Sequence, residues 1–247
     1  MRRVRLYRVS SLVIRQRALG EADRIITLYT RERGKVSAVA KGVRRARSKL
    51  AGGLQLFCHA RMQLAAGRSL EVVTQVQPVD VFYRLREEMR RYVHASYAAE
   101  LLDSLVDEEA SDPALFDLLL GTYRGLDGGA DPPTLTLAFQ LKLLGRLGYG
   151  PELGICVLCG GEIGKGKAGF SAAQGGTVCG RCLRSHSAAA VGPEAVRAMR
   201  ELAALPTEEL AKRRLTGAVR EELERVLRPF VDYQLPRPLR SAEFLTA

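Results

Sequence analysis

Five short stretches within the first 80 residues alternate apolar and polar side chains, and turn-forming glycines separate them. Runs of this length, rich in Val, Ile, Thr and Tyr, predict antiparallel β-strands. They cover residues 6–17, 24–31, 35–41, 54–64 and 69–76. Five strands in so short a segment suit a small closed barrel of the oligonucleotide-binding (OB) type, and an SH3-like barrel is the competing topology.

A dense run of cations lies between the third and fourth predicted strands. From Gly34 to Phe57 the chain carries six Lys or Arg and no Asp or Glu. Such a loop repels itself unless a polyanion neutralises it. Three arginines on the first two strands are expected to extend this surface along a phosphate backbone. The expected DNA contacts are Lys35, Lys41, Arg44, Arg45, Arg47, Lys49, Arg15, Arg17 and Arg24.

The net charge of +11 is unevenly distributed along the chain. Residues 1–80 hold 17 Lys or Arg against 5 Asp or Glu, whereas residues 81–150 hold 7 against 11. Residues 151–247 hold 14 against 11. This asymmetry indicates that the first third of the chain contacts an anionic partner and that the middle has another task.

The apolar runs of the sequence are far too short to span a membrane, and the N-terminus lacks the apolar core of a signal peptide. We therefore expect a cytoplasmic protein with no membrane partner. The sequence has no phosphate-cradling motif G-x-x-x-x-G-K-[ST], and no small-molecule substrate is expected. Thiols stay reduced in the cytoplasm, so the five cysteines indicate metal binding before disulfides.

The apolar period changes from two residues to about 3.6 after Asp80, which is expected to cap a long amphipathic helix over residues 82–105. Residues 114–126 and 135–147 predict two more helices, and others follow Pro193. The expected fold is α+β and multidomain. Its expected parts are an OB-fold DNA-binding domain (1–80), an α-helical domain (81–150 and 191–247, with a C-terminal tail) and an inserted zinc module (151–190).

Four of the five cysteines form two pairs with the spacing C-x2-C-x19-C-x2-C. Two such pairs bring four thiolates to one tetrahedral Zn²⁺, and four thiolates leave no open coordination position. The glycine-rich segment between the pairs has little apolar core, so metal is expected to supply its folding energy. The predicted ligands of one structural Zn²⁺ are Cys156, Cys159, Cys179 and Cys182.

Two stretches together resemble the RecO family of bacterial recombination mediators. Residues 20–57 are similar to the N-terminal signature of that family, and residues 139–160, FQLKLLGRLGYGPELGICVLCG, resemble its junction between helix and metal module. The order of barrel, helices, cysteine module and helices matches over essentially the whole chain. Some family members lack the cysteines, whereas this sequence has all four.

The resemblance implies a non-enzymatic mediator of DNA repair and recombination. Such a mediator binds single- and double-stranded DNA, anneals complementary strands and, with RecR, helps to load RecA onto strands coated by single-strand-binding protein. The basic positions of the family fall on Lys35, Lys41, Arg44, Arg45 and Lys49.

The resemblance also implies a surface for the acidic, apolar C-terminal tail of single-strand-binding protein. Such a tail needs an apolar slot bordered by cations. The helix predicted at 135–147 offers Lys142 and Arg146 beside Leu143 and Leu147, and we expect the tail to bind there.

Two alternatives remain at this point. One is a zinc-containing OB-fold regulator of transcription or RNA. The other is a metal-dependent nuclease, which is disfavoured because a closed zinc site has no place for a water. The three histidines lie far apart in sequence, and the carboxylate pair Glu21 and Asp23 adjoins Arg24, which favours a salt-bridged turn over a catalytic site.

Overall fold

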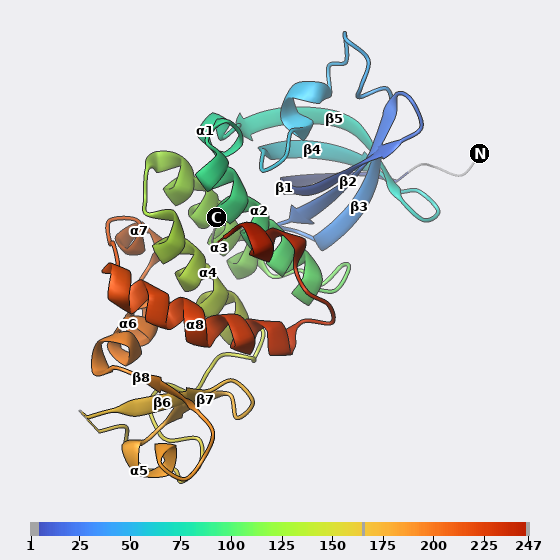
Figure 1. Cartoon of the computed structure of the whole chain (residues 1–247). Helices are drawn as coiled ribbons and strands as arrows, with labels where there is room; N and C mark the ends of the chain where they lie inside the picture. The colour runs from blue at the N-terminus through green and yellow to red at the C-terminus, as the bar shows by residue number, and fades with distance from the viewer. Residues whose placement is uncertain (1–4, 165, 246–247) are drawn as a thin grey trace. The chain divides into compact units, whose positions relative to one another are not determined.

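The computed structural model describes residues 5–164 and 166–245, which form two compact units, residues 5–127 and residues 128–245 (Figure 1). The first unit opens with a closed barrel of strand order β1-β2-β3-β5-β4. β3 pairs with β5 in parallel, and the other neighbours pair antiparallel. This five-stranded Greek-key barrel confirms the OB-type prediction. Its strands are β1 (Leu6–Leu19), β2 (Asp23–Thr30), β3 (Gly34–Ala40), β4 (His59–Ala65) and β5 (Glu71–Asp80).

The long strand β1 closes the barrel. Its first half pairs with β4 and its second half with β2, and the register shifts between Val13 and Arg15. A bulge of this kind bends a strand and increases its twist, which lets one strand border two neighbours. Inward-facing side chains from all five strands fill the core, among them Val9, Ile26, Val36, Met62 and Val73.

The prediction of a strand over residues 54–64 is wrong in its first part. A 3-10 turn, η1 (Ala51–Leu54), precedes β4, which begins only at His59. Phe57 has a φ of 69°, which a strand does not allow. Its fully buried ring packs edge-on against Tyr92 and Tyr123. The apolar run therefore marks a buried turn.

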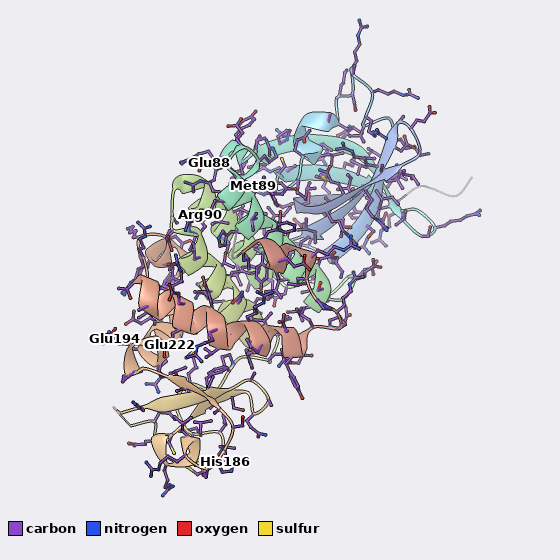
Figure 2. The ribbon with its side chains drawn as sticks, in the orientation of Figure 1. Glu88, Met89, Arg90, His186, Glu194 and Glu222 are labelled. Atoms are coloured by element: carbon purple, nitrogen blue, oxygen red, sulfur yellow. The ribbon has the colours of Figure 1, made fainter. Side chains whose placement is uncertain are left out.

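The single helix predicted at 82–105 is two helices, α1 (Tyr83–Glu87) and α2 (Met89–Leu105). Glu88 has extended backbone angles and forms ion pairs with Arg84 and Arg91, one on each side of the break. Figure 2 labels this junction. Met89, which was expected on the apolar face, is 76% exposed. Helix α3 (Pro113–Gly128) follows as predicted.

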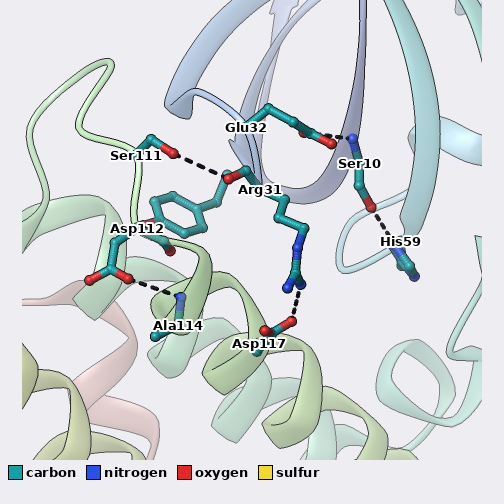
Figure 3. A network of polar contacts seen from close by, with 9 residues as sticks. Ser10, Arg31, Glu32, His59, Ser111, Asp112, Ala114 and Asp117 are labelled. Atoms are coloured by element: carbon teal, nitrogen blue, oxygen red, sulfur yellow. Dashed lines mark hydrogen bonds and ion pairs between the residues drawn. The ribbon is translucent and has the colours of Figure 1, made fainter.

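Asp80 is not a helix cap. It ends β5, and its carboxylate binds His59 and Arg124. His59 Nδ1 lies 3.2 Å from Asp80 Oδ2. On the other side of the ring, His59 Nε2 lies 2.9 Å from Ser10 Oγ, the contact that Figure 3 shows. A neutral imidazole with its proton on Nδ1 satisfies both contacts, because Nε2 then accepts from the Ser10 hydroxyl. Burial lowers the pKa of His59, although the Asp80 carboxylate opposes this shift.

This lowered pKa predicts a pH dependence of stability. Below the unfolded-state pKa of about 6.5 the unfolded chain binds a proton at His59 more readily than the folded chain does. The free energy of unfolding is therefore expected to fall between pH 7 and pH 5, and more steeply in the wild type than in His59→Gln. Urea unfolding at several pH values measures both slopes. Equal slopes would contradict the prediction, and His186→Gln, at an exposed histidine, serves as the control.

The second unit contains a helical layer and a small sheet. Helix α4 (Pro132–Arg146) starts at Asp131, whose carboxylate accepts the N–H of Thr134 at 3.2 Å. It packs against helices that follow the cysteine module in sequence, so the module is an insertion between packed helices. These helices are α6 (Pro193–Ala204), α7 (Thr207–Leu210) and α8 (Gly217–Gln234).

The inserted module is built on a three-stranded sheet of order β7-β6-β8. Its elements are β6 (Ala168–Ser171), β7 (Gly176–Val178), α5 (Gly180–Leu183) and β8 (Ala189–Val191). Outside the module, a 3-10 turn, η2 (Arg240–Phe244), follows helix α8. Phe170 on β6 meets Phe230 on α8 edge-on at 5.6 Å between ring centroids, which ties the sheet to the helices. In residues 5–164 and 166–245, no helix has both the length and the apolar character that crossing a bilayer requires.

Candidate nucleic-acid interface and metal centre

Residues 41–50, here called the basic loop, project from the end of β3 (Figure 1). The base of the loop is fixed, because Asp23 Oδ1 accepts the N–H of Gly42 at 2.7 Å and Ala22 O accepts that of Arg44 at 2.9 Å. Asp23 thus supports a turn, as the sequence suggested, though through backbone and not through Arg24. The exposed cations of the loop are Lys41, Arg44, Arg45, Arg47 and Lys49.

Lys35 and Arg15, both predicted to contact phosphate, are paired with a carboxylate of the protein itself. Lys35 Nζ donates to Asp103 O at 2.7 Å and lies 3.4 Å from Asp103 Oδ1, and only 15% of the side chain is exposed. Arg15 Nε lies 3.3 Å from Asp103 Oδ2. One carboxylate on α2 therefore neutralises two cations that charge counting assigned to phosphate.

The segment from Asp103 to Asp112, here called the acidic cover, lies along β2 and β3. Glu109 donates its N–H to Lys35 O at 3.0 Å, and a side chain added at Gly34 would meet Ala110 O at 2.1 Å. Ser111, which follows Ala110 in sequence, donates its hydroxyl to the carbonyl of Arg31 at 3.2 Å (Figure 3). The cover therefore occupies the β2–β3 face, where OB folds commonly bind oligonucleotides.

The two remaining strand arginines differ. Arg24 donates to Gln16 Oε1 at 2.8 Å and is half-buried, so it supports the sheet. Arg17 is exposed near the end of β1, as expected for a phosphate contact.

A groove that sequence reasoning missed lies over β1, β4 and β5. Its volume is about 710 Å³, and its lining combines three cations, Arg8, Arg61 and Lys49, with Glu32 and with uncharged polar and apolar side chains. The alternation of apolar and polar residues in β1 and β4 indicated which side chains point outward. It did not indicate that these side chains lie next to one another, because that depends on the order of the strands in the barrel.

The four paired cysteines come together. Their sulfur atoms all lie within 4.8 Å of one another, and Cys159 Sγ is 3.8 Å from Cys179 Sγ. A tetrahedral site with metal–sulfur bonds of about 2.3 Å needs sulfurs about 3.8 Å apart. The cluster could therefore hold one metal ion.

Backbone geometry prepares these thiols for metal. Gly160, with a φ of 69°, turns the first pair so that its N–H reaches Cys156 O at 2.8 Å. Burial opposes ionisation of Cys156, but backbone N–H groups outweigh it and lower its pKa to about 6. The hydrogen bond with the Cys159 sulfur, helped by burial, raises the pKa of Cys182 to about 12. A dication would replace the retained proton, and Arg181 Nη2, 3.7 Å from Cys159 Sγ, offsets part of the thiolate charge.

His186 lies beside α5 (Figure 2). Its Nδ1 is 3.2 Å from Cys182 O, so the histidine supports the backbone of the second pair, and four thiols remain the donor set.

The slot expected on α4 is only partly present. Leu143 is fully buried and so forms no surface wall. Lys142 Nζ donates to Ala203 O at 3.1 Å, and burial lowers its pKa. Arg146 is exposed and Leu147 is half-buried.

The chain matches two family models, described as recombination protein O N terminal over residues 1–82 and recombination protein O C terminal over residues 86–243. Three curated relatives are each called DNA repair protein RecO. The one from Roseiflexus sp. (strain RS-1) is 40% identical over 98% of this chain and 86% of its own length. Those from Symbiobacterium thermophilum and Pelotomaculum thermopropionicum are 39% and 37% identical over 97% and 98% of this chain, and over 96% and 94% of their own lengths.

Both halves of the chain are thus matched in the order that the structure shows, with an OB-type barrel, helices and a four-cysteine cluster. The chain belongs to the RecO family of DNA repair and recombination proteins.

Proposed function

We propose that this protein is a non-enzymatic recombination mediator that binds single- and double-stranded DNA and anneals complementary strands. The observation that carries the proposal is the basic loop, which presents five exposed cations at one end of an OB-type barrel. Cations that neutralise phosphates let two strands approach without repulsion, and this contact needs no base recognition. The proposed contacts are Lys41, Arg44, Arg45, Arg47, Lys49 and Arg17.

In this role the protein acts with RecR and helps to load RecA onto strands coated by single-strand-binding protein, because family membership supports both. The protein works at the nucleoid in the cytoplasm. The metal is Zn²⁺, held by Cys156, Cys159, Cys179 and Cys182, and its role is structural because four thiolates close the coordination shell.

One cluster on the barrel resembles a catalytic triad. Ser10, His59 and Asp80 are joined in the order of a serine hydrolase. Arg124, however, shares Asp80 Oδ2 with His59 and weakens its support for a charged imidazole. The N–H of Ser10, a natural oxyanion donor, is taken by Glu32 Oε2 at 2.9 Å (Figure 3). The cluster therefore joins strands and is not expected to hydrolyse anything.

The function is tested by annealing of complementary oligonucleotides, bare and coated with single-strand-binding protein. The wild type should accelerate annealing of both. Arg146→Glu should lose acceleration on coated strands only, if the exposed Arg146 binds the acidic tail. If the wild type does not accelerate annealing of bare strands, the proposed function is contradicted. If Arg146→Glu accelerates annealing of coated strands as well as the wild type does, only the proposed tail site is contradicted.

A further inference from the structure

The outer face of β1, β4 and β5 carries an ordered set of polar side chains. Val9 and Met62 point into the barrel core, so the residues next to them in sequence point outward. The strand registers join the outward residues into two rows across three strands. These rows, here called the polar face, are Arg8–Gln63–Gln75 and Ser10–Arg61–Gln77.

The polar face forms much of the groove of about 710 Å³, and the groove is cationic. Arg8 and Arg61 are exposed, and in the described part of the chain neither forms an ion pair. Glu32 is the acidic residue that borders the groove, and its carboxylate accepts the N–H of Ser10. Lys49, which belongs to the basic loop, also lines the groove, so the loop and the polar face adjoin.

The alternative face of the same barrel is closed. The acidic cover lies along β2 and β3, and Asp103 pairs with both Lys35 and Arg15. Tyr29 is fully buried there, and its hydroxyl donates to Asp112 O at 3.4 Å. A polyanion approaching this face would meet carboxylates and would have to displace packed backbone.

We propose that a single DNA strand runs from the basic loop across the polar face, over β1, β4 and β5 and not over β2 and β3. This inference rests on the proposed function and adds the path of the strand. Arg8, Arg61 and Lys49 contact phosphates. The amides of Gln63, Gln75 and Gln77 each offer donors and an acceptor, which suits hydrogen bonds to bases of any identity.

The test is the affinity of Arg8→Glu/Arg61→Glu for a labelled oligothymidylate strand as a function of salt. Each phosphate contact on a single strand contributes about 0.7 to the slope of log K against log salt. Loss of two contacts should lower the slope by about 1.4 and the affinity at 0.1 M salt by about 25-fold. Arg8→Ala/Arg61→Ala removes the same two contacts and should show this loss, whereas the charge reversal should lower the affinity further because it repels phosphates. Circular dichroism verifies that both variants fold.

A matched control makes the same change of net charge elsewhere. Arg90 on α2 and Arg197 on α6 are exposed, and Arg90→Glu/Arg197→Glu should leave affinity within about twofold. If both double variants lose affinity equally, or if neither does, the strand does not cross the polar face and the inference is overturned. If the wild type itself binds no single strand, the proposed function fails first, which distinguishes the two failures.

Discussion

Cys159→Ser is expected to abolish metal binding at the four-cysteine cluster and to unfold the module around it. The core of the module consists of Cys156, Val178 and Cys182 with a few half-buried neighbours, which is too little apolar surface for independent stability. Structural zinc contributes on the order of 10 kcal/mol to such sites, so its loss should expose residues 151–191 to protease. Metal analysis should find one zinc in the wild type and none in the variant.

The fifth cysteine provides the control. Burial raises the pKa of Cys58 to about 11, so this thiol stays protonated and is no ligand. Cys58→Ala should lose some stability through a small cavity but should keep its zinc. Cys159→Ser should lower the thermal stability of the protein but leave its DNA affinity nearly unchanged. The reason is that the basic loop belongs to the other compact unit. Absence of zinc from freshly purified, reduced wild type would falsify the assignment.

The barrel and the cysteine cluster were predictable from sequence because each depends on a local rule. Alternation and glycine spacing gave the strands, and C-x2-C pairs gave four thiols that the fold does bring within 4.8 Å. The helix break at Glu88 was not predictable in the same way. The apolar period continues through Glu88, whose backbone is nevertheless extended, so periodicity alone predicts one unbroken helix.

Charge counting predicted a cationic barrel but not which cations are free. Lys35 and Arg15 are as basic in sequence as Arg44, yet Asp103, nearly 70 residues further along than Lys35, neutralises both. Leu143 likewise fits an exposed slot by helical spacing, yet it is fully buried. In each case the decisive contact is long-range, and a single sequence without the tertiary structure does not identify it.

Replacing Arg44, Arg45 and Arg47 by alanine is expected to give the largest loss of DNA affinity. All three are exposed on the basic loop, and the contacts that fix its base involve backbone N–H groups and Asp23, so the loop should keep its course. Three lost phosphate contacts should lower the slope of log K against log salt by about 2 for single strands. Affinity at 0.1 M salt should then fall on the order of 100-fold. Fluorescence anisotropy at several salt concentrations measures both quantities.

Lys35→Met with Arg15→Met is the informative comparison, because it removes two cations that the structure pairs with Asp103. This variant should lower thermal stability, since it leaves a half-buried carboxylate without its partners, yet its salt slope should stay near that of the wild type. The opposite result is that Lys35→Met with Arg15→Met lowers the salt slope by as much per removed cation as the triple alanine variant of the basic loop. In that case DNA reaches the β2–β3 face. The acidic cover must then move aside when DNA binds, and exposed charge on the loop is not what selects the binding surface.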